Sequence, residues 1–181
     1  MKRLINVFKL IVSPGSTWIS IFQTSSHQML ERALFYPMIA IYAVSFFLRL
    51  VYDPTLDFSE VLTDAIIGFV AYFIGYLIVA QILNIVIPKL QEEGKSSSEG
   101  KIRTFVIYSM SILLMIDILQ NLLPSNLILL TILQFYLVYV IDKAKTQFHL
   151  NEDKTLVFLV VSFALIFIAP ILIRNFFDMF L

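Results

Sequence analysis

Long apolar runs, separated by short polar segments, make up most of the chain after residue 32. An α-helix needs about 20 apolar residues to cross the hydrocarbon core of a bilayer, and five runs reach or approach that length. They cover residues 33–51, 65–87, 105–123, 127–141 and 156–173, of which the fourth is the shortest. The pattern predicts an all-α membrane protein in which residues 33–181 form a five-helix transmembrane bundle.

The N-terminal segment, residues 1–32, has a different pattern, in which cations are interleaved with apolar residues. Residues 2–12 place apolar side chains on one face of a helix and cations on another, which is typical of an amphipathic interfacial helix. Ser13 and Pro14 then suit the N-cap and first position of a second short helix. This arm either lies on the cytoplasmic leaflet or packs on the protein's own cytoplasmic loops. Its predicted interfacial anchors are Phe8, Pro14 and Trp18.

Composition favours a bilayer over water as the solvent for this chain. The 181 residues are 59% hydrophobic and 14% charged, and the mean hydropathy is +0.87. A soluble domain of this length could not cover so apolar an interior with so few charges. The formal net charge is zero, so charge gives no reason to expect a nucleic-acid partner. The chain has no cysteine, which excludes disulfides, Cys-ligated zinc and iron–sulfur clusters.

The positions of the cations predict the orientation of the spans. Four Lys or Arg residues precede the first predicted span, four lie between the second and third, and three lie between the fourth and fifth. Only Arg49 and Arg174 fall at the opposite membrane face. Because cytoplasmic loops are enriched in Lys and Arg, the N-terminus is predicted to be cytoplasmic and the C-terminus to lie outside.

Asp117 is the one formally charged residue deep inside a predicted span. An ionised carboxylate there costs about 2.5 to 3.5 kcal/mol on insertion scales, so it should be paired or protonated. Arg49 and Arg174, at the outer ends of their spans, are its predicted partners in an intramembrane ion pair. Two hypotheses stay open for Asp117. One is a proton or cation site, and the other is a structural ion pair or a neutral, hydrogen-bonded acid.

Small residues recur on one side of the second predicted span, at Gly68, Ala71 and Gly75. Small side chains let another helix backbone approach closely, so these positions predict a helix-packing seam. The partner of the seam is either another helix of the same chain or a helix of another chain. The pattern does not distinguish the two.

Sequence patterns for catalysis and metal binding are absent. His27 and His149 lie in polar segments and belong to no metal-binding pattern. There is no phosphate-binding glycine loop, no nucleophile elbow and no dinucleotide-binding turn. An intramembrane protease would need a second catalytic group to act with Asp117. We therefore predict no catalytic residue, no metal and no cofactor, and a protein that is not an enzyme.

Three short motifs accompany the five predicted spans. The first is Ser13-Pro14-x-x-x-Trp18-Ile19 in the arm. The second is Gly100-Lys101-Ile102-Arg103-Thr104-Phe105-x-x-Tyr108, which enters the third span, and that span closes at Leu122-Leu123-Pro124. The third is Tyr136-x-x-Tyr139 through Lys143-Ala144-Lys145. Together they resemble the Yip family of Ypt/Rab-interacting membrane proteins in its bacterial form. One departure is Ser111-Ile112, where the family often has a proline.

The resemblance implies five spans, a cytoplasmic N-terminus and a location in the plasma membrane, here a bacterial inner membrane. Eukaryotic members bind small GTPases and act in vesicle traffic, and no catalytic residue comes with the resemblance. We therefore predict a non-enzymatic protein that acts through helix–helix or protein–protein association. Its predicted partners are the lipid bilayer and either a second copy or another membrane protein. The alternative is a small transporter, or a transporter subunit, that uses Asp117 for proton or ion coupling.

Overall fold

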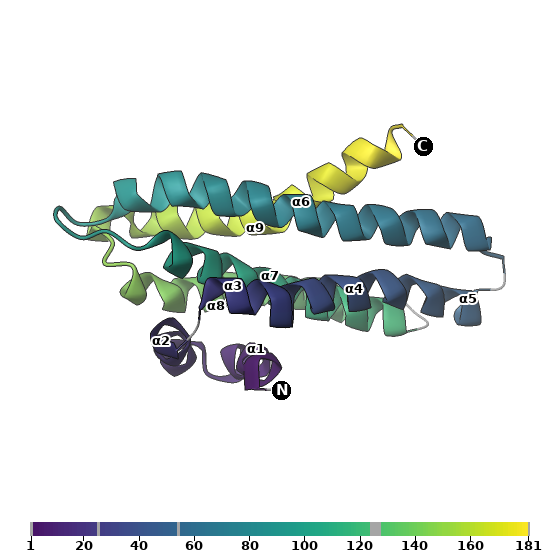
Figure 1. Ribbon diagram of the computed structural model, residues 1–181, viewed down its shortest axis with the longest axis horizontal. Coiled ribbons are helices and arrows are strands. Elements are labelled where there is room, and N and C mark those ends of the chain that lie inside the picture. Colours follow the sequence, from purple (N-terminus) through teal and green to yellow (C-terminus); the bar gives the residue numbers. More distant parts are fainter. Residues whose placement is uncertain (1, 25, 54, 124–127, 181) are drawn as a thin grey trace.

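The computed structural model describes residues 2–24, 26–53, 55–123 and 128–180. Over these residues the secondary structure is helical, apart from loops and one isolated antiparallel bridge between Gln91 and Leu150. Long helices run along one axis, and two short N-terminal helices lie across them (Figure 1). The predicted all-α class is confirmed.

The arm consists of α1 (Lys2–Val12) and α2 (Pro14–Thr24). A first long rod runs without a break through α3 (His27–Leu30), a π-helical turn (Glu31–Phe35), α4 (Tyr36–Ser45), a 3₁₀ turn (Phe46–Leu48) and α5 (Arg49–Tyr52). The other long helices are α6 (Phe58–Leu90), α7 (Glu99–Leu122), α8 (Ile128–Ala144) and α9 (Thr155–Asp178). Two 3₁₀ turns, Lys145–Gln147 and Glu152–Lys154, lie between α8 and α9.

Four of these helices are long and apolar enough to cross a membrane, so the chain is an integral membrane protein. They are His27–Tyr52, Phe58–Leu90, Glu99–Leu122 and Glu152–Asp178. The fourth predicted span corresponds to α8, whose 17 described residues are fewer than a spanning helix usually has. Residue 127, where that predicted span begins, lies outside the described residues. A fifth crossing therefore stays a prediction.

The long helices extend beyond the apolar runs that predict them, because polar side chains cap their ends. α6 begins at Phe58, well before residue 65. Asp57 and Glu60 form a capping box around the first backbone N–H groups of the helix. α7 begins where Ser98 Oγ accepts a hydrogen bond of 3.3 Å from the Lys101 backbone N–H. Hydropathy alone does not detect such caps. The helices are therefore longer than the predicted spans.

The long helices form two layers, with α6 beside α9 on one side and the first rod, α7 and α8 on the other (Figure 1). α6 contacts α4, α7 and α9, so it is central to the bundle. The C-terminal part of α9 turns away from α6. This bend lies at Pro170, which has no N–H to donate and whose ring crowds the Ile166 carbonyl one turn earlier.

The ends of α6 and α8 and the start of α7 meet at one end of the bundle. Gln91 Nε2 donates to the Phe148 carbonyl at 2.6 Å, next to the bridge between Gln91 and Leu150. The Lys101 ammonium, in the first turn of α7, donates to the Gln147 carbonyl. These contacts make α8 antiparallel to α7.

The arm is fastened to α7 and α8 through its tryptophan. Trp18 is fully buried, and its indole Nε1 donates to the Val140 carbonyl at 2.9 Å. Its ring packs against Phe22, Phe105 and Tyr108, with centroids 5.2, 5.6 and 6.3 Å away. Trp18 is therefore covered by the chain's own helices. It is not available to lipid headgroups, which corrects the anchoring role expected of it.

Further hydrogen bonds hold α1 against the bundle. The Tyr136 hydroxyl donates to the Ile11 carbonyl at 2.8 Å, and Asn6 Nδ2 donates to the Tyr108 hydroxyl at 3.4 Å. Pro14, another predicted anchor, begins α2 and is buried. Of the three predicted anchors, only Phe8 is exposed, at 53%.

Candidate functional site

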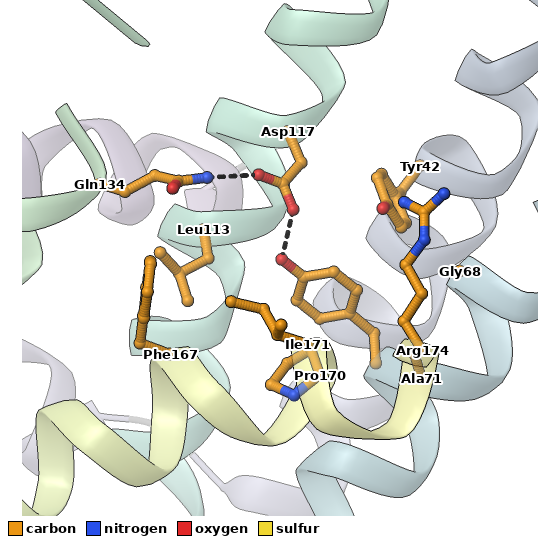
Figure 2. Close-up of a pocket in the computed structure, with 11 residues that line it drawn as sticks. Tyr42, Gly68, Ala71, Leu113, Asp117, Gln134, Phe167, Pro170, Ile171 and Arg174 are labelled. Carbon is orange, nitrogen blue, oxygen red and sulfur yellow. Dashed lines mark hydrogen bonds between the residues drawn. The ribbon is translucent and has the colours of Figure 1, made fainter. Parts of the chain in front are cut away.

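A cavity of about 110 Å³ lies between the long helices, near the bend of α9. Every long helix contributes to its wall, so side chains from distant parts of the sequence face one another there (Figure 2). The lining residues are Tyr42, Gly68, Ala71, Tyr72, Leu113, Asp117, Gln134, Phe167, Pro170, Ile171 and Arg174.

Asp117 supplies the carboxyl group of this cavity. The Tyr72 hydroxyl donates to its Oδ2 at 2.5 Å, and Gln134 Nε2 donates to its Oδ1 at 2.8 Å, as the dashed lines in Figure 2 show. Tyr72 belongs to α6 and Gln134 to α8, so the carboxyl group of α7 joins three helices. Both donors are neutral. They stabilise a carboxylate by hydrogen bonding without cancelling its charge.

The arginines predicted to pair with Asp117 pair with Asp64 instead. Arg49 Nη1 lies 2.8 Å from Asp64 Oδ2, and Arg174 Nη2 lies 3.3 Å from Asp64 Oδ1. These three side chains are 31 to 37% exposed, at the end of the bundle where α6 begins. Pairing there keeps both guanidinium groups out of the deeper hydrocarbon region, where a charge costs more. The predicted ion pair of Asp117 is therefore replaced by one that centres on Asp64.

Arg174 still reaches the wall of the cavity. In Figure 2 it lies beside Tyr42, on the side away from Gln134. The Phe46 ring lies close to both arginines, with its centroid 5.7 Å from Arg174 Cζ and 5.9 Å from Arg49 Cζ. These cation–π contacts help to hold both guanidinium groups at this end of the bundle.

The predicted packing seam faces other helices of the same chain. A Cβ atom added at Gly68 would lie 3.0 Å from Tyr42 Cε1, and one added at Gly75 would lie 3.5 Å from the nearest atoms of Pro170. α6 therefore packs on α4 at Gly68 and on α9 at Gly75. Ala71 lies between them in sequence and lines the cavity. The seam thus forms part of the cavity wall.

A second polar cluster, which sequence reasoning missed, lies near the opposite end of the bundle. The Tyr76 hydroxyl donates to Glu31 Oε1, and Arg103 Nη1 lies 3.6 Å from the same oxygen. Arg103 Nε also pairs with Glu99 Oε1 at 2.7 Å. The cluster brings together the π-helical turn, α6 and α7. A usable signal was Glu31 itself, an acid just ahead of the first apolar run.

The cavity offers one carboxyl group, two phenol hydroxyls and one amide, with an arginine at its edge. Its described lining residues include no Ser, Thr, His or Lys that could act as a nucleophile or base beside Asp117. In the part of the chain that the structure describes, no three His, Asp or Glu side chains come together. This arrangement suits the locking of helices or the binding of a proton or cation.

Comparison with known proteins gives one match. A search of curated proteins and a search of solved structures each find no significant match. A family model described as Yip1 domain matches residues 8–173, which run from the arm into α9. Yip1 is not a known enzyme family. Because the match covers nearly the whole of a chain with several apolar spanning helices, the chain belongs to the Yip family of membrane proteins.

Proposed function

We propose that this chain is a non-enzymatic protein that acts through association in the membrane, with its arm on the cytoplasmic leaflet. The observation that carries the proposal is an apolar row on α1 that the bundle leaves uncovered. Four side chains of this row are 44 to 84% exposed: Leu4, Ile5, Phe8 and Val12. Trp18 fastens the arm to α8, so the row keeps a fixed position on the protein.

The direction and chemistry of the arm support a leaflet as its surroundings. α1 and α2 lie across the long helices in Figure 1, which is how a helix in the membrane plane crosses a spanning bundle. Val7 and Leu10 bury one face of α1 against the protein, so the exposed row is a second apolar face. Acyl chains would cover this second face. Lys9 is exposed and can extend its ammonium to the headgroups.

The proposal includes five membrane crossings and an N-terminus in the cytoplasm of a bacterial cell. α8 has 17 described residues, so it is about 26 Å long, close to the hydrocarbon thickness of about 30 Å. Its end lies beside the start of α7 and the end of α6, which supports a full crossing. The loops at this end carry most of the cations, so we place it on the cytoplasmic side.

Single cysteines test the five crossings, because the chain has no cysteine of its own. We expect a membrane-impermeant maleimide, added to intact cells, to label Thr55→Cys. Glu93→Cys and Asp153→Cys should stay unlabelled until the membrane is permeabilised. All three positions are exposed. Labelling of Asp153→Cys in intact cells, with Glu93→Cys still protected, would mean that α8 does not cross.

Association is tested by cross-linking the full chain in its own membranes and purifying it in mild detergent. We expect a reproducible stoichiometric complex, made of several copies or formed with another membrane protein. The double variant Phe8→Glu/Val12→Glu should lower its recovery several-fold, because two carboxylates keep the arm out of the leaflet where association is proposed.

The matched control for this experiment is Gly15→Ala, also in the arm, because a Cβ there would meet nothing within 4 Å. It should leave the recovery unchanged. Single copies alone from the native chain would contradict association. A lone chain that carries a bound solute would favour the alternative of a small transporter that uses Asp117.

A further inference from the structure

The Asp117 carboxyl group has hydrogen-bond donors but, among the residues that the structure describes, no cation within 4.0 Å. Its donors, the Tyr72 hydroxyl and the Gln134 amide, are both uncharged. Each carboxyl oxygen takes part in one of these bonds, an arrangement that an ionised carboxylate satisfies. Over the described residues, the ion pairs within 4.0 Å all involve other acids. An ionised Asp117 would therefore have no ion-pair partner within 4.0 Å among the described residues.

The arginines at this end of the bundle already share their charge with other carboxylates. Arg49 and Arg174 both contact Asp64, and Arg174 Nε also lies 3.8 Å from Asp178. Two cations and two anions make this cluster neutral on its own. The positive charge of Arg174 acts on Asp117 only from beyond 4.0 Å, so a closer cation would lower the cost of an ionised carboxylate in hydrocarbon.

The cavity beside Asp117 has room for a small ligand and oxygen atoms to hold it. Its volume is about 110 Å³, whereas one water molecule occupies about 30 Å³ in the liquid. The Tyr42 and Tyr72 hydroxyls and the Gln134 side chain line it. These atoms could complete the coordination of an ion at Asp117.

We propose that this cavity binds a single alkali-metal cation, with the Asp117 carboxylate as its counter-ion. Carboxylate, phenol and carbonyl oxygens are hard ligands that suit such ions. One carboxylate neutralises one positive charge, whereas a divalent ion would leave net charge in a medium of low dielectric constant. Arg174, which lines the cavity, is 36% exposed, so the cavity wall reaches the surface of the bundle. The inference does not depend on the proposed association.

Thermal unfolding of the full chain in mild detergent tests the site. The chloride salts of Na⁺, K⁺ and Li⁺ are compared at constant ionic strength with tetramethylammonium chloride, whose cation is too large for the oxygen ligands to surround. At an ion concentration ten times the dissociation constant, binding should raise Tm by roughly 3 to 5 °C. The rise should continue with the logarithm of the ion concentration. Equal Tm values in all four salts would overturn the proposal and leave Asp117 as a structural acid.

Variants assign any salt effect to this cavity. Asp117→Asn keeps the size of the side chain and should abolish the difference between the salts. Asp53→Asn, which removes an exposed carboxylate outside the cavity, should keep it. Tyr72→Phe keeps the ring but removes one oxygen, so a higher ion concentration should be needed for the same Tm rise. A difference between the salts that survives in Asp117→Asn overturns the proposal. If Asp117→Asn does not fold, Tyr72→Phe decides instead, and an unaltered salt effect in that variant overturns the proposal.

Discussion

Trp18→Ala is expected to lower the free energy of unfolding by about 3 to 5 kcal/mol, the cost typical of cutting a buried aromatic side chain to alanine. The side chain is fully buried between α2, α7 and α8, where its ring packs on Phe22, Phe105 and Tyr108. The substitution also leaves the Val140 carbonyl without its indole donor. Thermal unfolding in detergent should show a fall in Tm of roughly 10 °C.

Limited proteolysis separates release of the arm from general instability. With Trp18→Ala, cleavage after Lys9 should become faster at temperatures where the bundle is still folded, because α2 has lost its attachment to α8. Ile19→Ala is the matched control, since Ile19 is the next residue and is 46% exposed. It should change stability by less than about 0.5 kcal/mol. A Trp18→Ala protein that resists cleavage at Lys9 as well as the native chain would show that the arm is held elsewhere.

The position of Trp18 shows what an amphipathic pattern leaves undecided. The apolar residues of the arm cover two faces: Val7 and Leu10 face the bundle, while Phe8 and Val12 are exposed. Helical spacing identifies apolar faces, but it does not say whether protein or lipid covers each one. The structure places one face of the arm against the bundle, and the leaflet interpretation stays a prediction. The chain's own helices cover one face of α1, and the other face is exposed.

The motifs of the family resemblance meet at the attachment of the arm. Trp18 comes from the first motif, and it packs on Phe105 and Tyr108 of the second. Tyr136, which opens the third motif, donates to the Ile11 carbonyl of α1. Short motifs from distant parts of the sequence thus build one packing junction. The resemblance could identify the family, but the spacing alone did not show that these residues are in contact.

The partners of Asp117 were harder to predict than its presence. A carboxylate inside an apolar run is visible in the sequence, whereas the choice of partner depends on which side chains the fold brings to the same depth. Asp64 lies at the depth of Arg49 and Arg174 and takes both of them. Hydropathy counted Asp64 only as part of a loop, because it lies just before the apolar run. Because the capping box starts α6 at Phe58, Asp64 is part of that helix.

The glycines of α6 link helix packing to the polar cavity. Gly68 lies against Tyr42, a lining residue of the cavity, and against Phe46, whose ring lies close to both arginines. The Tyr42 ring centroid is 5.1 Å from that of Phe46 and 5.1 Å from that of Tyr72. Tyr42 therefore has little room to move. A larger side chain at Gly68 should therefore shift Tyr42 and Phe46, and with them the cavity at Asp117 and the ion pairs of Asp64.

Gly68→Ala should destabilise the protein by about 1 kcal/mol, because an overpacking cost of about 2 kcal/mol is offset in part by the better helix propensity of alanine, about 1 kcal/mol. Its new Cβ would lie 3.0 Å from Tyr42 Cε1 and 3.1 Å from Phe46 Cε2, and both rings are buried. Gly75→Ala, two turns along the same helix, is the matched control. Its nearest contacts would be an ordinary 3.5 Å, so the better helix propensity of alanine should leave it neutral or up to about 1 kcal/mol more stable. Thermal unfolding of both variants in the same detergent measures the difference, and equal Tm values for the two would mean that α4 can move away from α6 at Gly68.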